Sequence, residues 1–73
     1  PSPMPYIQAM DYLSLSSDNT VIIEDSKTGL LSGIKTNAKV IGLTTSLKHD
    51  QIKNIDDNIL IAESYKDIAG FLK

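Results

Sequence analysis

The chain has 73 residues and a net charge of −2 at pH 7, with nine acidic residues against seven lysines and no arginine. This length fits one small domain, and the weak charge without arginine argues against a nucleic-acid partner. No apolar run approaches the roughly 20 residues that cross a bilayer, so we expect no membrane partner. Without cysteine or a secretory signal pattern, the chain is compatible with a cytoplasmic enzyme.

The first expected element is a helix that begins near Pro5, because proline fits the first turn of a helix. Its apolar residues follow helical spacing: Tyr6, Ile7, Met10 and Leu13. Turn-forming residues at 16–19 end this helix. The β-branched run Thr20–Ile23 comes next and is typical of a strand covered on both faces, as in a parallel sheet.

A second helix is expected over Lys27–Thr36, with its apolar side facing the sheet. Gly29 and Gly33 lie four residues apart on this helix. Glycine costs about 1 kcal/mol relative to alanine inside a helix. Two glycines at this spacing therefore predict close packing of the helix against a strand.

The remaining sequence predicts two more strands and two more helices. Lys39–Leu43 and Ile59–Ile61 read as strands, separated by a short helix over Leu47–Ile52 that Ser46 caps. Ser64 caps a last helix, whose expected buried stripe is Tyr65, Ile68, Ala69 and Leu72. Alternating strands and helices predict an α/β fold, with a short parallel sheet and flanking helices in a partial Rossmann-like, three-layer arrangement.

Two adjacent carboxylates, Glu24 and Asp25, directly follow the first apolar strand. Ligands of open parallel sheets gather at the carboxyl ends of the strands, and carboxylate oxygens are ligands that magnesium prefers. The same position also suits a helix N-cap, which Asp25 or Ser26 would provide for the following helix. Spacing alone leaves both interpretations open.

The wider pattern is more specific. Val21–Ser26, then Thr28–Leu30 and Asn37–Leu43, resembles the haloacid dehalogenase superfamily, in the branch of the β-phosphoglucomutases and phosphoglycolate phosphatases. In that family the strand, the Glu-Asp-Ser sequence and a glycine three residues after the serine form the fourth motif. The prolines near the start, followed by Tyr6, resemble the segment after the third-motif lysine. The resemblance covers nearly the whole chain.

The resemblance implies a magnesium-dependent phosphatase or phosphomutase that acts on a small phosphorylated metabolite. Asp25 would be a direct Mg²⁺ ligand, and Glu24 would assist at the metal, directly or through a water. The metal would neutralise charge on the phosphate during transfer. An aspartate nucleophile would form an aspartyl-phosphate, which water then hydrolyses.

Several parts of the family pattern are missing from these 73 residues. They are the first-motif aspartates, the second-motif serine or threonine, the third-motif lysine and the cap domain. We therefore expect residues 1–73 to be the C-terminal part of a core domain of this type, with no catalytic residue of its own and no turnover alone. A missing strand would leave one sheet edge bare, so we expect self-association through that edge. Where the family often has Ala-Gly before the next strand, this chain has Asn37-Ala38. Asparagine tolerates a left-handed turn, so this departure from the family pattern is acceptable.

Two other functions compete with the enzyme interpretation. A small non-catalytic α/β interaction domain would use the acidic pair only to cap a helix. A receiver-like phosphoacceptor domain would also place an aspartate at a strand end. The receiver interpretation is the weaker of the two, because it requires a second acidic cluster near the first strand and a lysine after a late strand.

Overall fold

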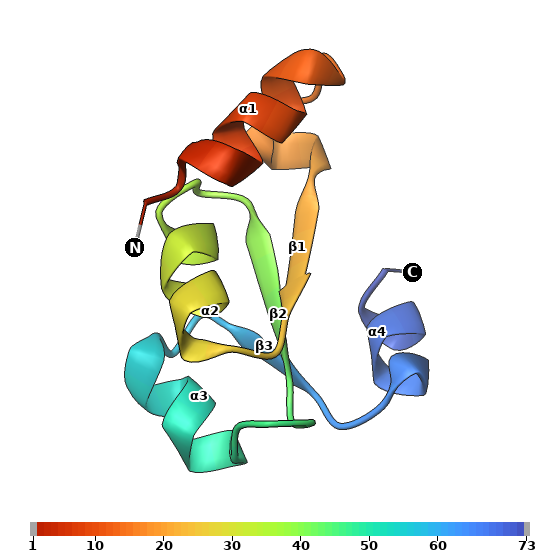
Figure 1. Ribbon diagram of the computed structural model, residues 1–73. Coiled ribbons are helices and arrows are strands. Elements are labelled where there is room, and N and C mark those ends of the chain that lie inside the picture. Colours follow the sequence, from red (N-terminus) through yellow and green to blue (C-terminus); the bar gives the residue numbers. More distant parts are fainter. Residues whose placement is uncertain (1, 73) are drawn as a thin grey trace.

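The computed structural model describes residues 2–72, in which helices alternate with strands (Figure 1). The chain begins with helix α1 and a short 3₁₀ turn, η1, and then forms three strands, each followed by a helix. In chain order the elements are α1 Met4–Tyr12, η1 Ser17–Asn19, β1 Val21–Glu24, α2 Lys27–Ile34, β2 Lys39–Leu43, α3 His49–Ile55, β3 Leu60–Ala62 and α4 Tyr65–Phe71. The predicted alternation of strands and helices is confirmed.

The three strands form one parallel sheet in the order β1-β2-β3. Ile22 lies opposite Val40, and Ile41 lies opposite Leu60. Parallel pairing requires a crossover between consecutive strands, and α2 and α3 provide these crossovers. The predicted α/β class with a short parallel sheet is therefore confirmed.

Helices cover both faces of the sheet, with α2 and α3 on one face and α4 on the other (Figure 1). Because side chains alternate along a strand, β2 contributes to both sides. The buried cluster beneath α2 and α3 consists of Ile22, Leu30, Val40, Ile52 and Ile59. The cluster beneath α4 consists of Ile41, Leu43, Ala62 and Ile68. The central strand is thus buried on both faces, as its apolar sequence predicts.

The α2 glycines have two different neighbours. A side chain at Gly33 would lie 3.2 Å from Ile22 and 3.4 Å from Val40, so here the helix does approach the strands closely. A side chain at Gly29 would instead overlap the carboxylate of Glu24. The close packing predicted from glycine spacing is confirmed at Gly33, whereas Gly29 makes room for an acidic side chain.

The last two helices differ in detail from the sequence prediction. Helix α3 begins at His49 rather than Leu47, because Lys48 is extended and donates its backbone N–H to the Gln51 side chain at 2.7 Å. In α4, Ile68 is buried and Phe71 packs beside it, whereas Tyr65, Ala69 and Leu72 are exposed. The predicted stripe was wrong at these three residues, because α4 packs on the sheet through Ile68 and Phe71.

Asn37, which follows α2, has a φ of 65°, in the left-handed region. The Thr36 hydroxyl donates to the Gly33 carbonyl at 2.7 Å and accepts from the Ala38 N–H at 3.1 Å. Asparagine adopts left-handed backbone more readily than most residues. The tight connection from α2 into β2 is therefore compatible with the asparagine in this position.

Strand β1 is an edge of the sheet. An apolar cavity of about 230 Å³ lies between α1 and β1, lined by Tyr6, Ala9, Met10, Leu13, Leu15, Thr20, Val21, Ile22 and Ile23. The Ile23 side chain is 41% exposed. No proline or lysine, the residues that commonly protect edge strands, occurs in Val21–Glu24.

Within residues 2–72, no helix is long and apolar enough to cross a membrane.

We predict that the 73-residue chain self-associates through this edge, and that Ile23→Lys weakens the association by about tenfold or more. A lysine on an edge strand opposes pairing with a second strand. Sedimentation velocity over a concentration series measures the effect. Leu72→Lys is the matched control, because Leu72 is 56% exposed and lies at the end of α4 rather than on the edge strand. A wild-type chain that stays monomeric would contradict the prediction, as would equal weakening by the two variants.

Candidate metal site at the carboxyl edge of the sheet

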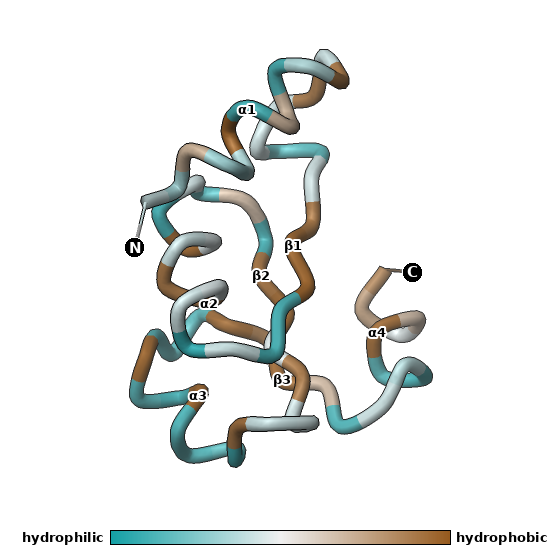
Figure 2. The backbone as a smooth tube through the Cα atoms, viewed as in Figure 1, coloured by the Kyte–Doolittle hydropathy of each residue, from teal (hydrophilic) through white to brown (hydrophobic). Residues whose placement is uncertain are grey.

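The turn Glu24–Ser26 lies where β1 ends and α2 begins, at the carboxyl edge of the sheet. Figure 2 shows hydrophobic strands leading into a hydrophilic turn at this point. The loop that follows β2 begins at the same edge. There the Thr44 N–H donates to the Ala62 carbonyl, at the end of β3, at 3.1 Å. Polar residues from consecutive strand ends are therefore brought together, as parallel pairing requires.

Ser26 is the N-cap of α2. Its backbone is extended, and its hydroxyl oxygen accepts a hydrogen bond from the Gly29 N–H at 3.0 Å. A serine in this role satisfies one of the free N–H groups in the first turn of the helix. Of the two residues considered for the cap, Ser26 fills it, and the Asp25 carboxylate contacts another part of the chain.

Asp25 connects the ends of two neighbouring strands. Its side chain is exposed, and its Oδ2 accepts a hydrogen bond from the Thr45 hydroxyl at 3.0 Å. Thr45 lies two residues beyond the end of β2. Thr45 was not among the predicted site residues, although its position after a strand adjacent to β1 is a signal that it lies near Asp25. This hydrogen bond orients the carboxylate, and within residues 2–72 no hydrogen bond to Oδ1 is present.

Glu24 points toward α2 rather than toward the exposed edge. Its Oε2 accepts a hydrogen bond from the hydroxyl of Tyr6 in α1. Its carboxylate also occupies the space above Gly29, where an added Cβ would lie 2.9 Å from Glu24 Cγ and closer still to the carboxylate atoms. Sequence analysis missed this role of Tyr6. The two predicted metal ligands are thus adjacent in sequence but make contacts with different elements.

The pKa of Tyr6 is raised from 10.0 to about 12, first by burial and then by the hydrogen bond to Glu24 and its negative charge. Because folding raises this pKa, the folded state retains the tyrosine proton more strongly than the unfolded state does. The resulting stabilisation is complete below pH 10 and disappears as the pH rises toward 12.

We therefore predict that the free energy of unfolding of the wild-type chain falls more steeply between pH 10 and pH 12 than that of Tyr6→Phe. Lysine deprotonation affects both proteins equally, so the difference between them isolates Tyr6. Urea unfolding followed by circular dichroism at a series of alkaline pH values measures it. Parallel pH profiles for the two proteins would show that the Tyr6 hydroxyl has no linked proton.

The ligand atoms available at this edge are oxygens, the atom type that magnesium binds. Mg²⁺ binds carboxylate oxygens and keeps several waters, and many sites use only one or two carboxylates together with substrate phosphate. Asp25 supplies one free carboxylate oxygen, and the Thr45 hydroxyl oxygen lies beside it. Among residues 2–72 there is no group of three or more His, Cys, Asp or Glu side chains arranged to hold a metal. If an ion binds at this edge, the available ligand is the Asp25 carboxylate.

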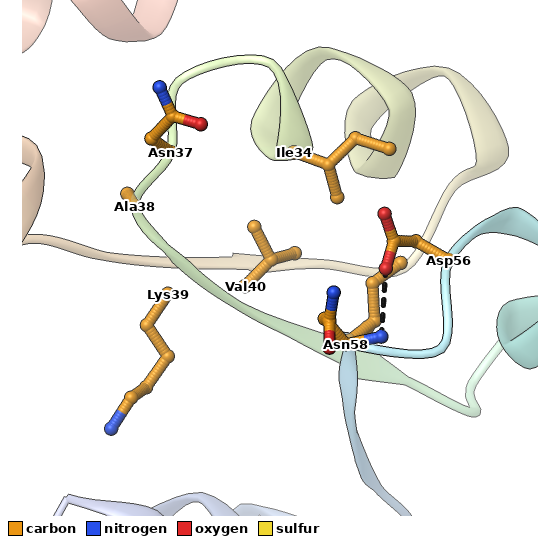
Figure 3. Close-up of a pocket in the computed structure, with 8 residues that line it drawn as sticks. Ile34, Asn37, Ala38, Lys39, Val40, Asp56 and Asn58 are labelled. Carbon is orange, nitrogen blue, oxygen red and sulfur yellow. Dashed lines mark hydrogen bonds between the residues drawn. The ribbon is translucent and has the colours of Figure 1, made fainter.

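A separate cavity of about 400 Å³ lies at the opposite edge, near the start of β2. It is lined by Ile34, Asn37, Ala38, Lys39, Val40, Asp56, Asn58 and Ile59 (Figure 3). The Asn58 N–H donates to Asp56 Oδ1 at 2.8 Å, which closes the turn before β3. Figure 3 shows the Lys39 side chain extending away from Ile34 and Asp56. No predicted site residue lines this cavity.

No protein family model and no solved structure matches the chain. The resemblance to the haloacid dehalogenase superfamily therefore remains an inference from the motif residues. The structure shows a short parallel sheet with flanking helices, and the acidic turn lies at the carboxyl edge of this sheet.

Proposed function

We propose that the chain is part of a magnesium-dependent phosphohydrolase of the haloacid dehalogenase type, in which Asp25 holds the metal. The supporting observation is the exposed Asp25 carboxylate directly after a parallel strand, oriented by Thr45 from the next strand end. The substrate class is a small phosphorylated metabolite, on which the complete enzyme acts as a phosphatase or a phosphomutase.

The residues of this chain would orient and support the site. Ser26 fixes the start of α2, and Thr45 fixes the direction of the Asp25 carboxylate. Bound magnesium would neutralise negative charge on the phosphate. The aspartate nucleophile, the third-motif lysine and the cap domain that the resemblance implies would belong to a longer chain.

The free edge of β1 supports this proposal. A further parallel strand added to β1 would end beside the Glu24–Ser26 turn, because the carboxyl ends of parallel strands lie at one edge. An aspartate just beyond such a strand would therefore face Asp25 across the site. A coding sequence upstream of Pro1 should specify an apolar strand followed by Asp-x-Asp, and a lysine immediately before Pro1. An upstream sequence without both features would contradict the proposal.

A second candidate is a non-catalytic α/β interaction domain. It is favoured by one observation, namely that both carboxylates already have partners within the chain, Tyr6 and Thr45. The two functions are separated by assaying magnesium-dependent turnover of a generic aryl phosphate by the full-length protein. The enzyme proposal requires turnover that depends on Asp25, whereas the interaction domain has none.

A further inference from the structure

We propose that Tyr6 and Gly29 form a seat that holds the Glu24 carboxylate out of the metal site, so that Asp25 is the only carboxylate available there. This inference rests on the proposed function and concerns the regulation of the same site. Tyr6 would be a positioning residue, since it acts on the ion only through Glu24. Tyr6 and Gly29 together form what we call the Glu24 seat.

Two independent contacts define the Glu24 seat. From α1, the Tyr6 hydroxyl donates to Glu24 Oε2. From α2, Gly29 leaves open the space that the carboxylate fills, and any side chain at position 29 would overlap it. Gly29 lies in the first turn of α2, where the helix dipole favours negative charge. The Glu24 position is therefore specified by residues from two different helices.

Asp25 has a different environment. Successive side chains of an extended segment point to opposite sides, and Asp25 is exposed with its Oδ2 bonded to Thr45. Glu24 is half-buried and bonded to Tyr6. For both carboxylates to bind one ion, Glu24 has to give up the hydrogen bond from Tyr6 and swing away from Gly29.

Ion binding and the attachment of α1 are then coupled. An ion that recruits Glu24 breaks the hydrogen bond from the Tyr6 hydroxyl, which joins α1 to the end of β1, so it loosens α1. By reciprocity, removal of the Tyr6 hydroxyl makes Glu24 more available and strengthens ion binding. A residue that merely stabilised the fold would weaken ion binding, or leave it unchanged, when mutated.

The test is Mn²⁺ binding to the 73-residue chain, followed by the loss of the free-ion signal in electron paramagnetic resonance. We expect Tyr6→Phe to bind Mn²⁺ about three- to tenfold more tightly than the wild type, because an additional ligand charge raises affinity. Adding Glu24→Gln to Tyr6→Phe should abolish the gain. Tyr12→Phe is the matched control on the same helix, since Tyr12 is 89% exposed.

Gly29→Ala provides a second route to the same result, because its methyl group displaces the Glu24 carboxylate without changing Tyr6. It also keeps the test decisive if Tyr6→Phe does not fold. Unchanged or weaker binding in the folded variants, with Asp25-dependent binding in the wild type, would overturn the seat alone. Absence of Asp25-dependent binding in the wild type and in both variants would overturn the metal site of the proposed function, and the seat with it.

Discussion

Replacing Asp25 by asparagine in the full-length protein is expected to reduce magnesium-dependent phosphatase turnover by about 100-fold or more. Removing one preorganised electrostatic contact to a reacting centre typically has an effect of this order. Asparagine retains a side-chain oxygen that accepts from Thr45, so the local structure should persist. Turnover of an aryl phosphate, with and without magnesium, measures the loss.

The melting temperature of Asp25→Asn should stay close to that of the wild type, because Ser26 rather than Asp25 caps α2. Glu24→Gln is the matched control at the neighbouring position. It should reduce turnover less, since the Glu24 carboxylate lies above Gly29 and accepts from Tyr6. Full magnesium-dependent activity in Asp25→Asn would contradict the assignment of this residue as the metal ligand.

Replacing Leu30 by alanine is expected to unfold most of the 73-residue chain at room temperature. Leu30 is a fully buried residue of α2, in a cluster with Ile22, Val40, Ile52 and Ile59. A buried Leu→Ala substitution costs about 2–5 kcal/mol, and a core of this size rarely supplies more than about 3–5 kcal/mol. Urea unfolding followed by circular dichroism measures the change.

Leu72→Ala is the control for this effect, because Leu72 is 56% exposed and lies at the end of α4. It should change the free energy of unfolding by no more than about 0.5 kcal/mol. A Leu30→Ala variant that stayed within about 1 kcal/mol of the wild type would show that α2 does not depend on this cluster. Another part of the core would then have to hold the turn Glu24–Ser26, between β1 and α2, in place.

The strands were predictable because each is a short apolar run bounded by turn residues. Thr20–Ile23 and the observed β1 differ by one residue at each end, and β2 matches Lys39–Leu43. The start of α3 was not predictable from Ser46, because the side chain of Gln51 binds the Lys48 N–H instead. The exposure of Leu72 depends on which side of α4 packs on the sheet, and that side carries Ile68 and Phe71.

The position of the acidic turn followed from local sequence, whereas its partners did not. Glu24 and Asp25 come directly after an apolar strand, so their place at the carboxyl edge was predictable. Tyr6 is 18 residues from Glu24, and Thr45 is 20 residues from Asp25. Their hydroxyls reach the carboxylates only once α1, β1 and β2 are assembled, so no spacing within one element indicates either contact.

The most direct test of the central claim is a magnesium titration of the ¹⁵N-labelled chain, followed by amide chemical shifts. The claim is that Asp25 holds the ion at the carboxyl edge of the sheet. We expect saturable shifts at residues 24–26 and at Thr45, with weak affinity in the millimolar range, about what few carboxylates without substrate phosphate provide. These shifts should disappear in Asp25→Asn. Shifts that persist in Asp25→Asn, or that occur only away from this edge, would contradict the claim.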